Sequence, residues 1–301
     1  MGSFKSGFVS LLGRTNVGKS TLINALVGEK VAIATSKTQT TRTAIKAIIT
    51  TNDYQIIITD TPGIHKPKNK LGETMIDTAY KIMEDVDCIL FLIEADHNKI
   101  GPGEQIILKK IIDSKKKCIL VINKIDLISK EELINLINLY KNEYNFEAIV
   151  PISAEKKRGI EELTEEIVKL LPEGPQYFNE DEYTDQTSRQ LAEEIIREKA
   201  LKLLDKEVPH GIYVEVEKFQ YRQTNHGEDI CDINAIIYCI RESHKGIIIG
   251  KDGSKLKKIG TYARQDLEKI LDVKINLKLW VKVNKEWQEK DNIIKKFKLK
   301  K

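Results

Sequence analysis

The sequence predicts a mostly parallel α/β sheet with helices on both faces, followed by a smaller α+β domain. Short apolar segments recur through the first 171 residues and alternate with segments whose apolar residues have helical spacing. The break Leu171-Pro172-Glu173-Gly174-Pro175 ends this alternation, and a different order of elements follows it. A chain of 301 residues is long enough for two such domains.

In the first half, each expected strand except one leads into an expected helix. The strands are expected at 8–12, 44–51, 55–59, 88–93, 118–122 and 148–151. The helices are expected at 21–26, 73–84, 104–113, 131–144 and 161–171. Helical crossovers join parallel strands, so we expect an α/β domain with a mostly parallel sheet over residues 1–174.

The second half begins after an expected linker at 175–187, which includes the acidic residues 180–182. Its first helix is expected to be capped by Ser188 and to carry one apolar stripe. Strands at 212–217 and 233–240, a helix after a glycine-rich turn, a strand at 273–283 and a basic terminal helix complete the domain at 188–301.

The pattern G-x-x-x-x-G-K-S lies between the first strand and the first helix and is typical of a phosphate-binding loop. Its residues are Gly13, Arg14, Thr15, Asn16, Val17, Gly18, Lys19 and Ser20, and Thr21 follows in the helix. Backbone N–H groups can surround a phosphate there, Lys19 can neutralise β- and γ-phosphate oxygens, and the Ser20 hydroxyl would bind Mg²⁺. The alternative is an ordinary glycine-rich turn.

A second segment with candidate ligands follows the apolar strand at 55–59. It consists of Asp60, Thr61, Pro62 and Gly63. Asp60 would hold Mg²⁺ through water, and the backbone amide of Gly63 could approach a γ-phosphate. Asp followed by Pro-Gly is common in turns, so this segment alone indicates little.

The pattern N-K-x-D follows the strand at 118–122 and indicates a guanine site. It contains Asn123, Lys124, Ile125 and Asp126, and a further segment, Ser153, Ala154 and Glu155, follows the last strand. The Asp126 carboxylate can accept two hydrogen bonds from guanine, and adenine lacks that donor pair. Asn123 would brace the loop, Lys124 would cover the ring, and a backbone amide at 153–155 would meet the guanine oxygen. We therefore expect GTP and GDP as ligands.

These four segments resemble the GTPase domain of the translation-factor-related class, and within it the Era family, which Asn16 and the run Gln39-Thr40-Thr41-Arg42 also resemble. The resemblance implies that Thr41 binds Mg²⁺ from switch I, with Thr40 left open as the ligand. Ile64 stands where many small GTPases have a water-orienting Gln, so intrinsic hydrolysis should be slow. The resemblance also suggests a potassium ion at Asn16, whose amide could instead only brace the loop. The catalytic residues implied are Lys19, Asn16, Thr41 and Gly63.

A second glycine-rich loop, Gly250, Lys251, Asp252 and Gly253, has the pattern G-x-x-G before a helix. Such a loop can clamp a single-stranded nucleic-acid backbone, and Lys255, Lys257 and Lys258 lie close to it. The order helix-strand-strand-helix-helix-strand resembles a type II KH domain. The alternative is a plain interhelical turn.

Charge is unevenly distributed along the chain. The net charge is +4, but the residues from Lys245 onward carry 17 basic and 7 acidic side chains. This suits a polyanion such as RNA or an anionic membrane, or else it is a solvated lysine-rich face. The four cysteines form no C-x-x-C pair, and we expect them to be reduced core residues in a cytoplasmic protein.

The family resemblance implies a GTP-hydrolysing switch that binds the 3′ region of 16S rRNA through its KH domain during 30S subunit assembly and 16S rRNA maturation. We expect a monomer, and the family also leaves open peripheral association with the inner face of the cell membrane. Two alternatives are a metabolic P-loop phosphotransferase and a membrane-surface regulatory GTPase whose C-terminal domain contacts lipid or protein. The segment Asn123–Asp126 argues against the phosphotransferase.

Overall fold

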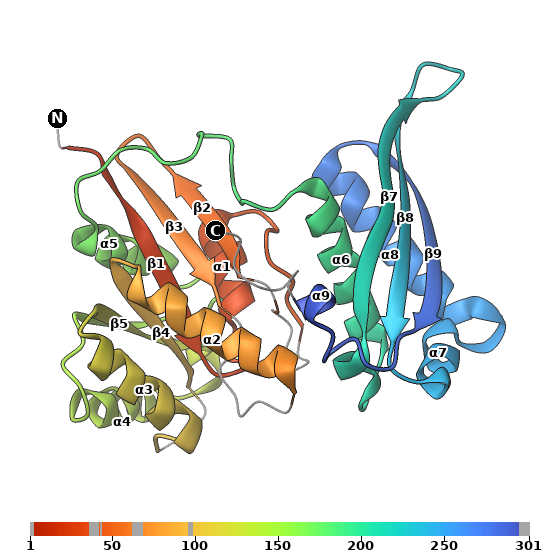
Figure 1. Cartoon of the computed structure of the whole chain (residues 1–301). Helices are drawn as coiled ribbons and strands as arrows, with labels where there is room; N and C mark the ends of the chain where they lie inside the picture. Colours follow the sequence, from red (N-terminus) through yellow and green to blue (C-terminus); the bar gives the residue numbers. More distant parts are fainter. Residues whose placement is uncertain (1–2, 36–41, 43, 62–68, 96–98, 295–301) are drawn as a thin grey trace. The chain divides into compact units, whose positions relative to one another are not determined.

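The computed structural model describes residues 3–35, 42, 44–61, 69–95 and 99–294. Contacts within the chain divide it into two compact units, the first reaching residue 185 and the second covering 186–293 (Figure 1). Each unit has its own sheet.

The first unit contains a six-stranded sheet. Its strands are β1 (Lys5–Gly13), β2 (Ile45–Thr50), β3 (Tyr54–Asp60), β4 (Cys88–Glu94), β5 (Lys117–Asn123) and β6 (Ala148–Pro151), in the order β2-β3-β1-β4-β5-β6. Only β2, in this sheet, runs antiparallel to its neighbour β3. The central strands are almost wholly apolar because helices bury both of their faces, as in β4, Cys-Ile-Leu-Phe-Leu-Ile-Glu. The expected mostly parallel sheet is confirmed.

Helices cover this sheet on both sides (Figure 1). They are α1 (Lys19–Val27), α2 (Lys70–Glu84), α3 (Pro102–Ser114), α4 (Lys130–Lys141) and α5 (Ile160–Leu170). One apolar cluster joins α1 and α5 to the sheet, and the other joins α2, α3 and α4 to its opposite face. The expected helix at 131–144 is wrong at its end, because α4 stops at Lys141 and Tyr144 leaves the helix to pack edge-on against Phe146.

Part of the segment expected to be a linker lies along the first unit. Gln55 is fully buried, and its side-chain oxygen accepts hydrogen bonds from the N–H groups of Tyr177 and Phe178 at 2.7 and 3.1 Å. Its amide nitrogen donates to the Phe178 carbonyl at 2.9 Å. Further along, Ile48 N–H donates to the Tyr183 carbonyl at 3.0 Å. Residues 177–185 are therefore fastened to the edge of the sheet, a feature we call the strap.

The second unit has the expected order of elements. These are α6 (Ser188–Leu203), β7 (Tyr213–Gln223), β8 (Asp229–Cys239), α7 (Glu242–Ile249), α8 (Ser254–Leu271), β9 (Lys274–Val283) and a short α9 (Asp291–Ile294). In its sheet, β8 lies between antiparallel β7 and parallel β9. This helix-strand-strand-helix-helix-strand arrangement is that of a type II KH domain.

The helix cap predicted at Ser188 is wrong, because Thr187 caps α6. The Thr187 hydroxyl accepts from the N–H of Gln190 at 3.3 Å, and the Gln190 side chain accepts from the N–H of Thr187 at 3.0 Å. Both residues can cap a helix, but only Thr187 has a Gln three positions later to close the capping box. Ser188 is the first residue of the helix itself.

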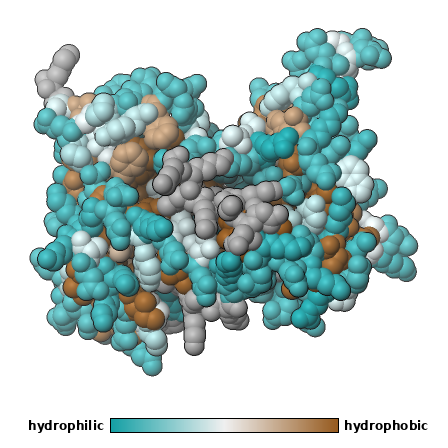
Figure 2. Space-filling view, in the orientation of Figure 1, coloured by the Kyte–Doolittle hydropathy of each residue, from teal (hydrophilic) through white to brown (hydrophobic). Residues whose placement is uncertain are grey.

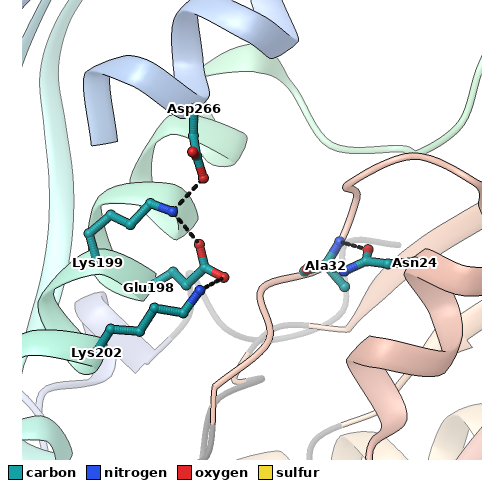
Figure 3. Close-up of polar contacts among 6 residues, drawn as sticks. All are labelled: Asn24, Ala32, Glu198, Lys199, Lys202 and Asp266. Carbon is teal, nitrogen blue, oxygen red and sulfur yellow. Dashed lines mark hydrogen bonds and ion pairs between the residues drawn. The ribbon is translucent and has the colours of Figure 1, made fainter. Parts of the chain in front are cut away.

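Charged side chains buried on α6 connect it to α8 (Figure 3). Glu198 is 1% exposed and accepts from Lys199 at 3.2 Å and from Lys202 at 3.0 Å. Lys199 also pairs with Asp266 of α8. Buried charges are tolerated when they are paired in this way, and the pair with Asp266 links α6 to α8.

Within the described parts of the chain, we find no helix long and apolar enough to cross a membrane. Figure 2 shows mostly hydrophilic residues on the visible face, with apolar residues in separate small patches. All four cysteines are free and buried, in agreement with their predicted place in the core.

Candidate functional site

The predicted phosphate and base segments meet at one edge of the first sheet. The parallel strands β1, β4 and β5 all end there, and their register places Gly13 opposite Leu92 and Glu94 opposite Asn123. Asp60, at the end of β3, lies opposite Leu11. Ligands of open α/β sheets bind outside the carboxyl ends of the strands, so this edge is the candidate nucleotide site.

The loop between β1 and α1 combines left-handed backbone with tightly packed glycines. Asn16 and Gly18 both have left-handed conformations, with φ of 69° and 99°. A Cβ atom on Gly18 would lie 2.3 Å from Nδ2 of Asn123, and one on Gly13 would lie 2.4 Å from the Leu92 carbonyl oxygen. Both glycines are therefore required by close packing.

Lys19 is buried at the start of α1. Its ammonium donates to the carbonyl oxygens of Gly13 and Arg14 at 3.1 and 2.7 Å. Burial lowers its pKa to about 8, and the nearby Asp60 carboxylate partly opposes that shift. A phosphate anion beside this ammonium would favour its charged form.

Two hard oxygen donors face each other beside Lys19. The Ser20 hydroxyl donates to Oδ2 of Asp60 at 3.2 Å, and both side chains are buried. The next residue, Thr61, donates from its hydroxyl to the Leu11 carbonyl at 2.6 Å and holds the end of β3 against β1. A hydroxyl and a carboxylate in this position are a donor set that fits Mg²⁺.

Asn123 joins three of the predicted segments. Its Nδ2 donates to the Val17 carbonyl in the phosphate loop at 2.8 Å, and its Oδ1 accepts from the N–H of Ala154 at 3.0 Å. Nearby, Ile125 N–H donates to the Ile152 carbonyl at 3.2 Å. The predicted bracing role of Asn123 agrees with these contacts.

The Asp126 carboxylate is exposed at this edge, where it could accept hydrogen bonds from a ligand. The hydroxyl of buried Ser153 donates to it and is the main reason that its pKa is lowered, with Lys156 and Arg158 adding positive charge. Asp126 therefore stays ionised and acts as an acceptor. Lys124, two positions before it, pairs with Glu94 at the end of β4.

Some predicted site residues lie outside the described residues. They are the switch I candidates Thr40 and Thr41 and the segment Pro62, Gly63 and Ile64. Of the others, Thr15, Thr21 and Glu155 lie within the three segments described above.

The second predicted site is the loop between α7 and α8. Gly250 and Gly253 both have φ of 74°, and Asp252 between them has φ of 51°. A Cβ atom on Gly250 would lie 2.8 Å from the Cβ of Lys255, so this turn requires glycine. Lys251, Lys257 and Lys258 are exposed around the turn, and Lys255 is half-buried. A phosphodiester chain at this turn would meet the ammonium groups of these lysines.

Three residues hold predicted site residues in place, and the sequence did not indicate these contacts. Glu94 pairs with Lys124, Glu104 contacts Arg14, and the Ser153 side chain holds Asp126. Glu94 could have been noticed as a charged end to an apolar strand. The other two contacts leave no local signal in the sequence.

Models of two known families match the chain. The model described as 50S ribosome-binding GTPase matches residues 8–124, and the model described as KH domain matches residues 207–288. The two matches fall in the two structural units.

The chain is also similar to proteins named GTPase Era over nearly its whole length. That of Caldanaerobacter subterraneus subsp. tengcongensis is 52% identical, covering 98% of this chain and 97% of its own. That of Clostridioides difficile (strain 630) is 52% identical, covering 98% of each chain.

Two solved structures of Era superpose on nearly the whole chain. A crystal structure of Era in complex with MgGDPNP and nucleotides 1506–1542 of 16S ribosomal RNA matches with a TM-score of 0.92 and 41% identity, covering 98% of both chains. A crystal structure of an Aquifex aeolicus Era variant bound to GDP·AlF4⁻ matches with a TM-score of 0.92 and 40% identity, covering 98% of this chain and 99% of that one. With these relatives, two family models and a matching fold, the chain belongs to the family of the GTPase Era.

Proposed function

We propose that this chain is a GTP-hydrolysing switch that binds the 3′ region of 16S rRNA through its KH domain and acts in 30S ribosomal subunit assembly and 16S rRNA maturation. As a member of the Era family, it is a GTPase. The observation that carries the proposal is that Asn123 joins the predicted phosphate loop to the two predicted base segments at one sheet edge, in a chain that also carries a G-x-x-G loop. We assign residues 1–174 to the GTPase domain and 188–301 to the KH domain.

Guanine selectivity would come from Asp126. Its ionised carboxylate would accept hydrogen bonds from N1–H and the amino group of guanine, and a backbone amide at 153–155 would meet the guanine oxygen. Lys124 would cover the ring, while Glu94 holds its ammonium. An adenine base offers no such donor pair, so it would leave Asp126 without partners.

The phosphate chain would lie over the loop from Gly13 to Ser20. Backbone N–H groups and Lys19 would bind the β- and γ-phosphates. Ser20 and Asp60 would hold Mg²⁺, with Thr41 as the further ligand implied by the family, and the ion would neutralise charge that develops during phosphoryl transfer. Gly63 would sense the γ-phosphate through its backbone amide.

The RNA would bind the second unit at Gly250–Gly253. The related Era structure contains nucleotides 1506–1542 of 16S ribosomal RNA, and this supports the same class of partner for this chain. Lys251, Lys257 and Lys258 are exposed beside the loop and would contact phosphates, so binding should weaken as salt concentration rises.

Crosslinking followed by sequencing of the bound RNA tests the proposal most directly. The purified full chain should crosslink to the 3′ region of 16S rRNA, and more strongly with a GTP analogue than with GDP. Hydrolysis should require Mg²⁺, and excess GDP but not ADP should inhibit it. Equal crosslinking to unrelated RNA, or hydrolysis blocked equally by ADP, would contradict the assignment.

The basic C-terminal region favours a second candidate, a GTPase that binds the cytoplasmic membrane surface peripherally. From Lys245 onward the chain carries ten more basic than acidic side chains. Flotation with anionic vesicles, compared with neutral ones, tests this candidate. If RNA and anionic vesicles compete for the chain, both partners bind the same lysines.

A further inference from the structure

Arg14 lies within the phosphate loop, but its side chain reaches away from the loop to α3. Its Nη1 atom donates to Oε1 of Glu104 at 3.3 Å. A Cβ atom on Gly103 would lie 3.2 Å from Cδ of Arg14, so the stem of Arg14 passes over a glycine at the start of the helix. The loop is thus connected to α3 through one side chain.

Glu104 is a buried carboxylate, only 3% exposed, with two contacts. Its Oε2 accepts from the N–H of Gly101 at 2.6 Å, as in a capping box, while its Oε1 accepts from Arg14. A carboxylate buried at this depth is costly unless it is hydrogen-bonded to a donor of opposite charge. The Arg14 guanidinium supplies that charge.

The backbone of Arg14 connects this pair to the phosphate site. Its carbonyl oxygen accepts from Nζ of Lys19 at 2.7 Å. Glu104 therefore holds the Arg14 side chain, and Arg14 in turn places one of the two carbonyls that orient the Lys19 ammonium. The path runs from α3 to the phosphate-binding lysine through two hydrogen bonds and one residue.

We propose that Glu104 is a positioning residue for phosphate binding: through Arg14 it holds the carbonyl that aims Lys19 at the β-phosphate. This inference rests on the proposed nucleotide site. It concerns the orientation of Lys19 and is separate from guanine recognition at Asp126. Losing the anchor should therefore weaken contacts to the β-phosphate and leave the contacts to the base unchanged.

The substitution E104Q separates this role from helix capping. Glutamine at the third helical position can still accept from the N–H of Gly101, so α3 keeps its capping box. It loses the negative charge that attracts Arg14. E104A, by contrast, removes both interactions and should also lower the melting temperature.

The test measures the dissociation constants of GMP and GDP for the full chain in Mg²⁺. The dissociation constant of GMP divided by that of GDP reports the affinity that the β-phosphate adds. We expect E104Q and R14A each to reduce this ratio about threefold to tenfold, the range of one charge-assisted hydrogen bond, with GMP binding unchanged. The double variant should lose no more than either single variant, because both remove the same contact.

Asp113, exposed near the end of α3, provides the matched control, and D113N should keep the wild-type ratio. The proposal is overturned if E104Q and R14A also keep that ratio, or if they weaken GMP and GDP binding equally. A wild-type chain that binds neither nucleotide would instead contradict the proposed function itself.

Discussion

At the scale of single residues, Asn123 connects the predicted phosphate loop to the predicted base segments. Its side chain bonds the phosphate loop at Val17 and the base segment at Ala154, and it blocks any side chain at Gly18. One amide therefore sets the spacing between the part of the site that would hold phosphate and the part that would hold the base. Bracing of this kind would reduce the conformational entropy that binding costs.

The substitution D126N should change which base the site prefers. The amide that replaces the carboxylate would present a donor to the N1–H and amino donors of guanine, and GTP affinity should fall by about two orders of magnitude. Xanthine has a carbonyl oxygen in place of the amino group, so XTP should bind the variant better than GTP does. Competition binding measures both affinities, with D113N as control, and an equal loss for GTP and XTP would contradict the assignment.

The Asn16 side chain should determine whether potassium stimulates hydrolysis. Asn16 has φ of 69°, a conformation that glycine adopts freely, so N16G removes the amide without straining the loop. We expect the wild type to hydrolyse GTP roughly an order of magnitude faster in potassium than in sodium, through added positive charge at the site. N16G should show no such difference. Equal wild-type rates in the two salts would leave Asn16 only a loop-bracing role.

At the scale of elements, hydrogen bonds attach the strap to the first unit, so this stretch of chain is not a free linker. Lys46, at the beginning of β2, donates its N–H to Asp185 at 3.0 Å, and its ammonium lies 5.7 Å from the centre of the Phe178 ring. β2 directly follows the predicted switch I, and the strap leads along the chain into Thr187, the cap of α6. The strap therefore connects the residues after switch I to the beginning of the second unit through hydrogen bonds and the chain itself.

Q55A should release the strap without unfolding the first unit. It would leave the N–H groups of Tyr177 and Phe178 without their buried acceptor, at a cost of about 1–3 kcal/mol. Hydrogen exchange should then become faster at 177–185 while the central strands stay protected. Gln176 also donates to the Phe178 carbonyl but is exposed, so Q176A is the matched control. Unchanged exchange in Q55A would show that other contacts hold the strap.

At the scale of the whole molecule, the proposed switch requires that nucleotide and RNA affinities depend on each other. Suppose that the chain binds RNA more tightly with a GTP analogue than with GDP, by some factor. RNA must then increase the preference of the chain for the analogue over GDP by the same factor. The dissociation constants of both nucleotides, measured with and without an RNA of the 16S 3′ region, give this factor. Replacing Lys257 and Lys258 by Glu should abolish the effect of RNA and preserve nucleotide binding, and a wild type without any mutual effect would refute the switch.

The sequence predicted the architecture correctly, a mostly parallel sheet followed by the KH order of elements. The motifs that contain the phosphate loop, Asp60, Asn123 and Asp126 each follow a strand within a few residues, and parallel strands bring their ends to one edge. The predicted end of α4 and the predicted cap of α6 were wrong because neighbouring residues have similar preferences for helical and capping positions. The strap was not predicted, since Gln55 lies more than 120 positions from its partners.

The sequence by itself determined the two folds, the guanine-type motif set and the G-x-x-G loop, because periodicity, glycine positions and spacing are local properties of the chain. Only the tertiary structure decided that Glu104 holds Arg14, that Glu94 holds Lys124 and that the Ser153 hydroxyl donates to Asp126. These contacts join side chains from different helices, strands and loops, and their strength depends on burial. Neither their distance nor their burial exists until the chain has folded.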